Sequence, residues 1–104
     1  MHAFDVLGEP VRRRILELLA DGETSSGAVC TVIQDEFGIS QPAVSQHLKV
    51  LKCAGLVADR AVGTRRVYQL NPKGIQELRA ELDVFWTKAL DAYKLIADEG
   101  GQDG

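Results

Sequence analysis

The spacing of apolar and polar positions predicts a mainly helical chain with one small hairpin. Apolar residues recur every three or four positions, the period of an amphipathic helix, in residues 10–21, about 26–37, 41–54 and 72–98. Prolines near the starts of these segments and glycines after most of them mark helix ends. A short apolar segment, residues 2–7, precedes them. Two runs of strand-forming residues, 56–60 and 65–70, flank a turn expected at residues 61–64, where Gly63 supplies backbone freedom.

The two central helices form a helix-turn-helix pattern. The short segment Gly38-Ile39-Ser40 separates them, and Ser40 is placed to cap the second helix, while Ser25 or Ser26 is placed to cap the first. Pro42 is tolerated in the first turn of the second helix. Together with the hairpin that follows, this order predicts a winged helix-turn-helix fold in one domain, residues 1–98, followed by a flexible tail, residues 99–104.

The second helix of this pattern has two different faces. At 100° per residue, Val44, Leu48 and Leu51 cluster within about 60° and form the packing face. Ser and Gln project from the opposite half, where ordinary surface helices carry Glu, Lys and Arg. Their side chains can hydrogen-bond base edges in a major groove. His47 lies at the border of the two faces, where hydrogen-bonded packing competes with base contact.

Charge is distributed unevenly along the 104 residues. The whole chain has a formal net charge of −3, but residues 41–70 hold five basic residues and a single acid, Asp59, a net +4. Such a basic stretch attracts phosphate, although it is equally compatible with a merely solvated surface. We therefore expect one DNA-binding face on an acidic body. Its expected contacts are Ser40, Gln41, Pro42, Ser45, Gln46, His47, Lys49, Arg60, Thr64, Arg65 and Arg66.

The last predicted helix has an apolar stripe longer than so small a domain can cover. A homodimer with two-fold symmetry would cover it and would suit an inverted-repeat DNA site, and an intramolecular fold-back is the alternative. The expected dimer surface comprises Phe4, Leu7, Leu78, Leu82, Phe85, Trp86, Ala89, Tyr93 and Ile96.

Three segments together resemble the ArsR family of bacterial winged-helix repressors. They are PVRRRILELLADGETSSGAV, GISQPAVSQHLKVLKCAGLV and GTRRVYQLNPKGIQELRAELDVFW, and the resemblance covers nearly the whole chain. Its most specific parts are SQPAVSQHLKVL and the GTRRVY of the hairpin. The resemblance implies a homodimeric repressor, often acting on its own promoter, that binds an imperfect inverted repeat in double-stranded DNA.

The sequence departs from the metal-sensing members of that family. Where they carry a Cys-x-Cys pair this chain has Cys30 alone, and residues 72–98 contain no histidine. A zinc or arsenite site needs three or four converging donors, so we expect no metal site, no cofactor and a place in the metal-independent branch.

Two other functional classes stay open at this stage. One is a redox- or ligand-responsive sensor using Cys53, which falls near the end of the presented helix face; Cys30 is expected to be a buried thiol. The other is a winged helix that binds protein rather than DNA. An enzyme is not expected, because no nucleophile–base pair, phosphate loop or paired carboxylates occur. The start of the chain has no secretory or membrane-spanning pattern, so a cytoplasmic location is expected.

Overall fold

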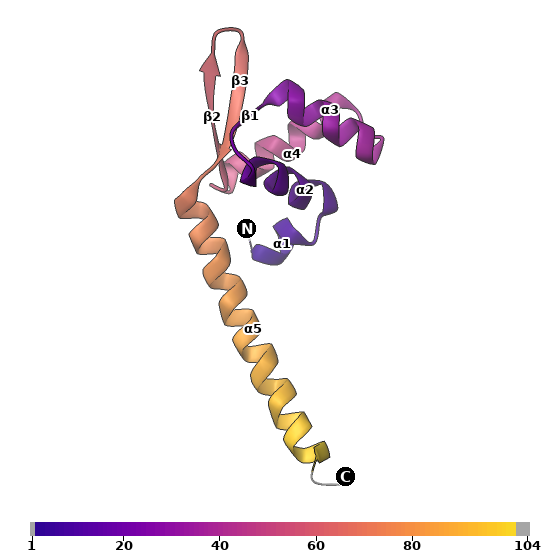
Figure 1. The fold of residues 1–104 in the computed structure, drawn as a ribbon, viewed down its shortest axis with the longest axis vertical. Helices are drawn as coiled ribbons and strands as arrows, with labels where there is room; N and C mark the ends of the chain where they lie inside the picture. Colours follow the sequence, from indigo (N-terminus) through magenta and orange to yellow (C-terminus); the bar gives the residue numbers. More distant parts are fainter. Residues whose placement is uncertain (1, 102–104) are drawn as a thin grey trace.

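A computed structural model describes residues 2–101, with side chains placed for residues 2–96. Four helices and a small sheet form a body, and a long fifth helix extends away from it (Figure 1). The molecule therefore measures 65 × 30 × 22 Å. In chain order the elements are α1 (Ala3–Leu7), α2 (Pro10–Ala20), β1 (Thr24–Ser25), α3 (Ser26–Phe37), α4 (Gln41–Cys53), β2 (Val57–Val62), β3 (Arg65–Leu70) and α5 (Pro72–Gly101).

Side-chain caps fix where the body helices begin. The Glu9 carboxylate accepts the backbone N–H of Arg12 at the start of α2, Ser25 caps α3, and Ser40 caps α4. Gly38, at φ 66°, closes α3 in the left-handed conformation that favours glycine. These caps confirm the predicted helix-turn-helix, and Ser25 is the serine of the predicted pair that caps α3.

Two helix ends differ from the sequence prediction. The helix α4 ends at Cys53, one residue earlier than expected, and α5 continues to Gly101, three residues beyond residue 98. Of the predicted tail, residues 102–104 lie outside the described residues, so its flexibility stays a prediction.

The sheet has three strands, where the sequence predicted only a hairpin. The order is β1–β3–β2, with both pairings antiparallel. The sequence does not indicate β1, because two residues are too few to show an alternating pattern and Ser25 is typical of a helix cap. The turn is also tighter than the expected residues 61–64. Gly63 adopts φ 63°, so the chain reverses over Gly63 and Thr64 and the ladder extends to the pair Val62 and Arg65.

The core lies where α2, α3, α4 and the base of the sheet meet. Val44, Leu48 and Leu51, the predicted packing face of α4, are all buried there. Cys30 of α3 is buried in the core as predicted, whereas Phe37, which the apolar spacing of residues 26–37 places on the packing side, is 37% exposed. Phe37 is the last residue of α3, so its side chain lies at the end of the helix rather than among the body helices.

Close backbone contact joins α5 to the body. Gly74, in the first turn of α5, is buried so closely against Gly55 and Leu56 that a Cβ atom there would collide with the Gly55 carbonyl oxygen. Farther along, the carboxylate of Glu81 accepts the backbone N–H of Ala3 at 2.7 Å, which ties α1 to the same helix. The fold-back alternative for α5 is not adopted, since its distal half extends past α1 (Figure 1). None of the helices formed by residues 2–101 has the apolar length that spanning a bilayer requires.

Candidate nucleic-acid interface

The outer face of α4 is polar and free to contact another molecule. Ser45, Gln46 and Lys49 are exposed on the side opposite the buried apolar residues. Among the residues that the structure describes, the side chains of Ser45 and Gln46 make no hydrogen bond within the chain. Both faces of α4 are therefore as predicted: one is fixed to the core, and the other presents hydroxyl and amide groups to solvent.

Two of the predicted DNA-contact residues at α4, Ser40 and His47, also form hydrogen bonds within the chain. The Ser40 hydroxyl oxygen accepts the N–H of Ala43 at 3.3 Å, although its own proton stays available to donate. His47 is half-buried against α2, where its Nδ1 accepts from Arg12 Nε at 3.4 Å and lies 3.7 Å from a Glu9 carboxylate oxygen. The packing contact expected as one role of His47 is therefore present, and it is made through Nδ1 of the ring.

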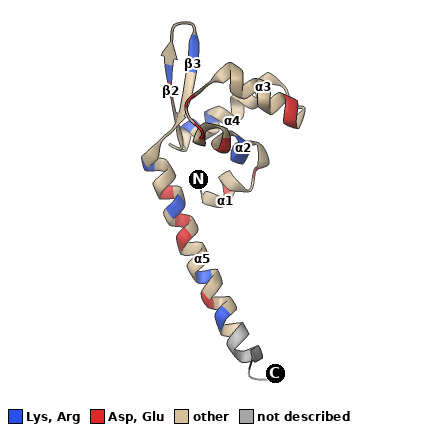
Figure 2. Ribbon diagram, viewed as in Figure 1, with Lys and Arg blue, Asp and Glu red and all other residues tan. Residues whose placement is uncertain are grey.

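The hairpin of β2 and β3 is the wing, and strand register separates its arginines. Arg60 pairs with Val67 and Val62 pairs with Arg65, so Arg60 and Arg65 belong to one face. Arg66 pairs with Ala61 on the other face. Blue segments of the ribbon mark basic residues on both strands in Figure 2. The sequence alone does not separate these three arginines, because the two faces follow from strand register.

Ion pairs further distinguish the basic residues. Asp59 accepts from Lys52 Nζ and from Arg66 Nη1, each at 2.9 Å, and the side chains of Arg60 and Glu23 pair at 2.8 Å. Hydrogen bonding by Lys52, followed by that of Arg66, holds the pKa of Asp59 below its usual value despite the opposing effect of burial. Lys49 and Arg65 take part in no ion pair within the described part of the chain.

Three residues that lie beside the wing tip are not among the DNA contacts predicted from the sequence. Ser25, Ser26 and Gly27 line a shallow recess together with Thr64 and Arg65. The recess exists because β1 pairs with β3, which brings the start of α3 next to the wing. No local sequence signal indicates a two-residue strand, so this neighbourhood could be found only in three dimensions.

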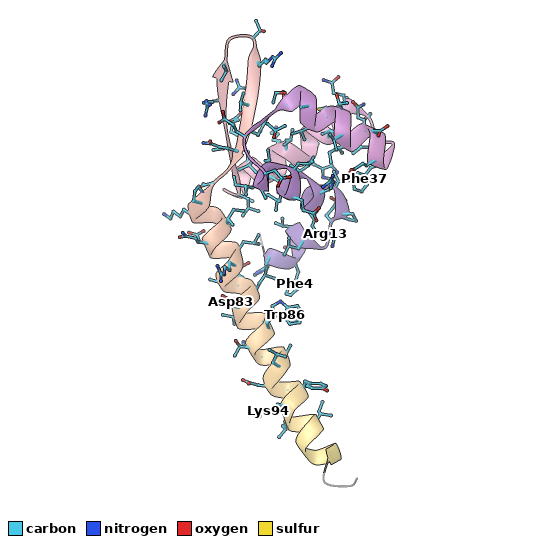
Figure 3. All side chains as sticks on the ribbon, viewed as in Figure 1. Phe4, Arg13, Phe37, Asp83, Trp86 and Lys94 are labelled. Carbon is cyan, nitrogen blue, oxygen red and sulfur yellow. The ribbon has the colours of Figure 1, made fainter. Side chains whose placement is uncertain are left out.

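A second exposed surface is apolar and lies on α1 and the distal part of α5. The side chains of Phe4, Phe85, Trp86, Tyr93 and Ile96 are 41–69% exposed. The ring centroids of Phe4 and Phe85 lie 4.7 Å apart in an edge-to-face arrangement, and those of Phe85 and Trp86 lie 5.4 Å apart in the same arrangement. Figure 3 labels Phe4 on α1 and Trp86 on α5, near the point where α5 leaves the body.

Other members of the predicted dimer surface lie deeper. Leu7 and Leu78 pack against the core of their own chain, and Leu82 and Ala89 are half-buried. The apolar surface is therefore continuous with the core through Leu7 and Leu78, and its exposed part is concentrated farther along α5.

The two cysteines differ in surroundings. Cys30 is buried, which raises the pKa of its thiol, whereas Cys53 is exposed at the end of α4. Cys53 lines a shallow recess together with Gln46, Lys49 and Val50 toward the C-terminal end of α4. Across the described residues, no group of three or more His, Cys, Asp or Glu side chains is placed to hold a metal ion.

A helix-turn-helix, a wing and an exposed polar face on the second helix define a winged helix-turn-helix DNA-binding protein, and known proteins agree. Residues 7–60 match the helix-turn-helix domain family. The chain is 50% identical over 101 residues to the HTH-type transcriptional regulator Rv2034 of Mycobacterium tuberculosis, covering 97% of this chain and 91% of that protein.

Two solved structures are similar along most of the chain. One, described as a possible transcriptional regulator for arsenical resistance, has a TM-score of 0.76 and 42% identity, with 94% of this chain and 96% of that one covered. The other is the homodimeric winged helix-turn-helix DNA-binding domain of Mb0332 from Mycobacterium bovis, a possible ArsR-family regulator. Its TM-score is 0.61 at 31% identity, over 86% and 80% of the two chains. This chain belongs to the ArsR family, and it is a DNA-binding transcriptional regulator rather than an enzyme.

Proposed function

We propose that the protein is a homodimeric repressor that binds an inverted-repeat operator, with α4 in the major groove and the wing along the neighbouring backbone. The observation that carries this proposal is the outer face of α4, where Ser45 and Gln46 are exposed while the opposite face is fixed in the core. A helix held in this way enters a groove without having to rearrange.

Different parts of the surface have different roles in this proposal. The side chains near the start of α4 contact base edges, and Lys49, one turn further along, contacts phosphate. The wing tip, with Thr64 and Arg65, follows the backbone or enters the minor groove. The proposed contact set is Ser40, Gln41, Pro42, Ser45, Gln46, His47, Lys49, Arg60, Thr64, Arg65 and Arg66.

A second copy of the chain is the proposed partner of the apolar surface on α1 and α5. Exposed aromatic side chains on a projecting helix are stabilised by burial against a matching surface, and two-fold pairing supplies one. The homodimeric state of the similar domain from Mycobacterium bovis supports this arrangement. The proposed interface is Phe4, Leu7, Leu78, Leu82, Phe85, Trp86, Ala89, Tyr93 and Ile96.

We expect the proposed regulator to be metal-independent and to act in the cytoplasm, where it can reach the chromosome. Repression of its own promoter is one expected mode of action.

One specific observation favours a second candidate, a thiol-responsive regulator: Cys53 is exposed on α4 close to Gln46 and Lys49. Alkylating or oxidising this thiol would place new bulk beside the proposed reading face. To decide between the two candidates, the wild type and Cys53→Ser are both treated with a thiol-blocking reagent, and DNA affinity is then measured. If the regulator is thiol-responsive, only the wild type loses affinity.

Selection of bound fragments from the genome of the source organism, using purified protein, tests the proposed function. The expected result is enrichment of fragments sharing an inverted repeat, with affinity that falls steeply as salt is added because phosphate contacts release counterions. Recovery of unrelated fragments, or binding that ignores salt, would contradict it and favour a winged helix that binds protein.

A further inference from the structure

The carboxylate of Asp59 joins the end of α4 to the wing. Its two oxygens separately accept from Lys52 Nζ on α4 and from Arg66 Nη1 on β3, each at 2.9 Å. The strand register explains the second contact, because Asp59 pairs with Tyr68 and is therefore diagonal to Arg66 on the same face of the hairpin. One side chain thus holds two cations, one near the end of α4 and one on the wing.

We propose that Asp59 is a positioning residue for DNA recognition, which fixes the wing against α4 and keeps the charges of Lys52 and Arg66 from neutralising DNA phosphates. The inference rests on the proposed DNA-binding mode and refines it by removing Arg66 from the phosphate contacts. Lys49 and Arg65 then carry the main phosphate contacts of α4 and the wing tip.

A neighbouring ion pair shows why Asp59 differs from an ordinary surface acid. In the pair of Arg60 and Glu23, the side chains are 52% and 46% exposed, so either can turn into solvent. Such pairs contribute little and constrain little. The Asp59 side chain is only 7% exposed, while Lys52 and Arg66 are each 52% exposed. Because this carboxylate is largely covered, moving either cation away would leave a poorly solvated charge with one partner fewer, which costs more than opening an exposed pair.

The inferred role predicts how binding responds to salt. Each phosphate neutralised by a Lys or Arg contributes about 0.9 to the slope of log affinity against log salt. If Asp59 holds Lys52 and Arg66 away from phosphate, their charges are absent from the wild-type slope. Removing the Asp59 charge releases both side chains, which can then contact any DNA whatever its sequence. Random DNA gains these contacts in full, whereas the operator complex also loses the wing position that Asp59 fixes, so discrimination between the two DNAs falls.

The experiment measures the affinity of Asp59→Asn for operator and random duplexes across several salt concentrations. The variant is expected to bind random DNA roughly tenfold more tightly at about 0.1 M salt, with a slope steeper by one to two units, and to lose discrimination. Asp59→Glu keeps the charge and should restore the wild-type slope. The triple variant that combines Asp59→Asn with Lys52→Gln and Arg66→Gln should also have the wild-type slope, because the two released cations are then absent. Loss of folding alone would weaken binding to both DNAs without steepening the slope.

The matched control is Glu23→Gln, which makes the same change in net charge beside Arg60. Its slope should stay that of the wild type because Arg60 is already free to turn. A pair of double variants gives an independent readout if Asp59→Asn folds poorly. Lys52→Gln with Arg66→Gln should leave the wild-type slope nearly unchanged, whereas Lys49→Gln with Arg65→Gln should lower it by about two units.

Equal losses of slope in the two double variants, or an unchanged slope in a folded Asp59→Asn protein, would overturn the role of Asp59. A steeper slope in Glu23→Gln would show that net charge alone is responsible and would also overturn it. These results leave the proposed function intact, since the wild type still binds its operator. Failure of the wild type to bind any DNA would instead refute both.

Discussion

The two exposed surfaces of this protein differ in chemistry and in what lies behind them. The outer face of α4 is polar, and the same helix is fixed to the core by Val44, Leu48 and Leu51. The distal part of α5 exposes aromatic and aliphatic side chains on a helix that extends beyond the body (Figure 1). A polar surface on a rigid support suits a hydrated, charged ligand, whereas an apolar surface without support gains from burial. This difference supports our proposal that the outer face of α4 recognises DNA and that the distal part of α5 forms the dimer.

The largest expected effect comes from making the apolar surface polar. Replacing Phe85→Ser and Trp86→Ser together should give a monomer, because the central aromatic area of the proposed interface is lost. Operator affinity should then fall by roughly 10²- to 10⁴-fold, since two half-sites are no longer held together. Sedimentation at micromolar concentration and operator titration measure the two effects.

The control for this double variant is Leu95→Ser on the same helix. Leu95 is 63% exposed and lies about 180° around α5 from Trp86. It should leave the dimer and operator affinity unchanged. A wild-type protein that sediments as a monomer at micromolar concentration would refute the proposed interface.

A smaller effect is expected at the junction of the two regions, where Gly74 packs on the backbone of Gly55. A Gly→Ala change inside a helix normally stabilises by up to about 1 kcal/mol. Gly74→Ala should instead lower the free energy of unfolding by about 1–3 kcal/mol, because the new Cβ meets backbone that no side-chain rotation can clear. Gly27→Ala, in α3 with open space around the Cβ position, is the matched control and should be neutral or stabilising. Thermal unfolding that ranks the two variants the other way would contradict the close contact.

The smallest expected effect is that of metal ions on the DNA complex. Stoichiometric zinc, cadmium or arsenite, or a chelator, should leave operator affinity unchanged, as expected for a metal-independent regulator. Titration of the DNA complex by fluorescence anisotropy provides the measurement. Tight metal binding by calorimetry coupled to release of DNA would point to Cys30 or Cys53 and refute this prediction.

The helices and their two functional faces could be predicted from sequence because their signals are local. A serine cap, a glycine end and the repeating Val44, Leu48 and Leu51 all act within a few turns. The partners of Asp59 could not be predicted in the same way, because they depend on strand register and on how the hairpin meets α4. For the same reason the sequence pattern does not distinguish Arg65 from Arg66, although they lie on different faces of the wing.

The central claim is that the outer face of α4 reads bases while the wing tip holds phosphate. It is tested most directly by measuring the affinity of Gln46→Ala and Arg65→Ala for operator and random DNA across several salt concentrations. Gln46→Ala should lose about 1–3 kcal/mol of discrimination with little change in salt slope. Arg65→Ala should weaken both complexes alike and lower the slope by about one unit. A folded, dimeric Gln46→Ala protein that kept full specificity would show that another surface reads the operator.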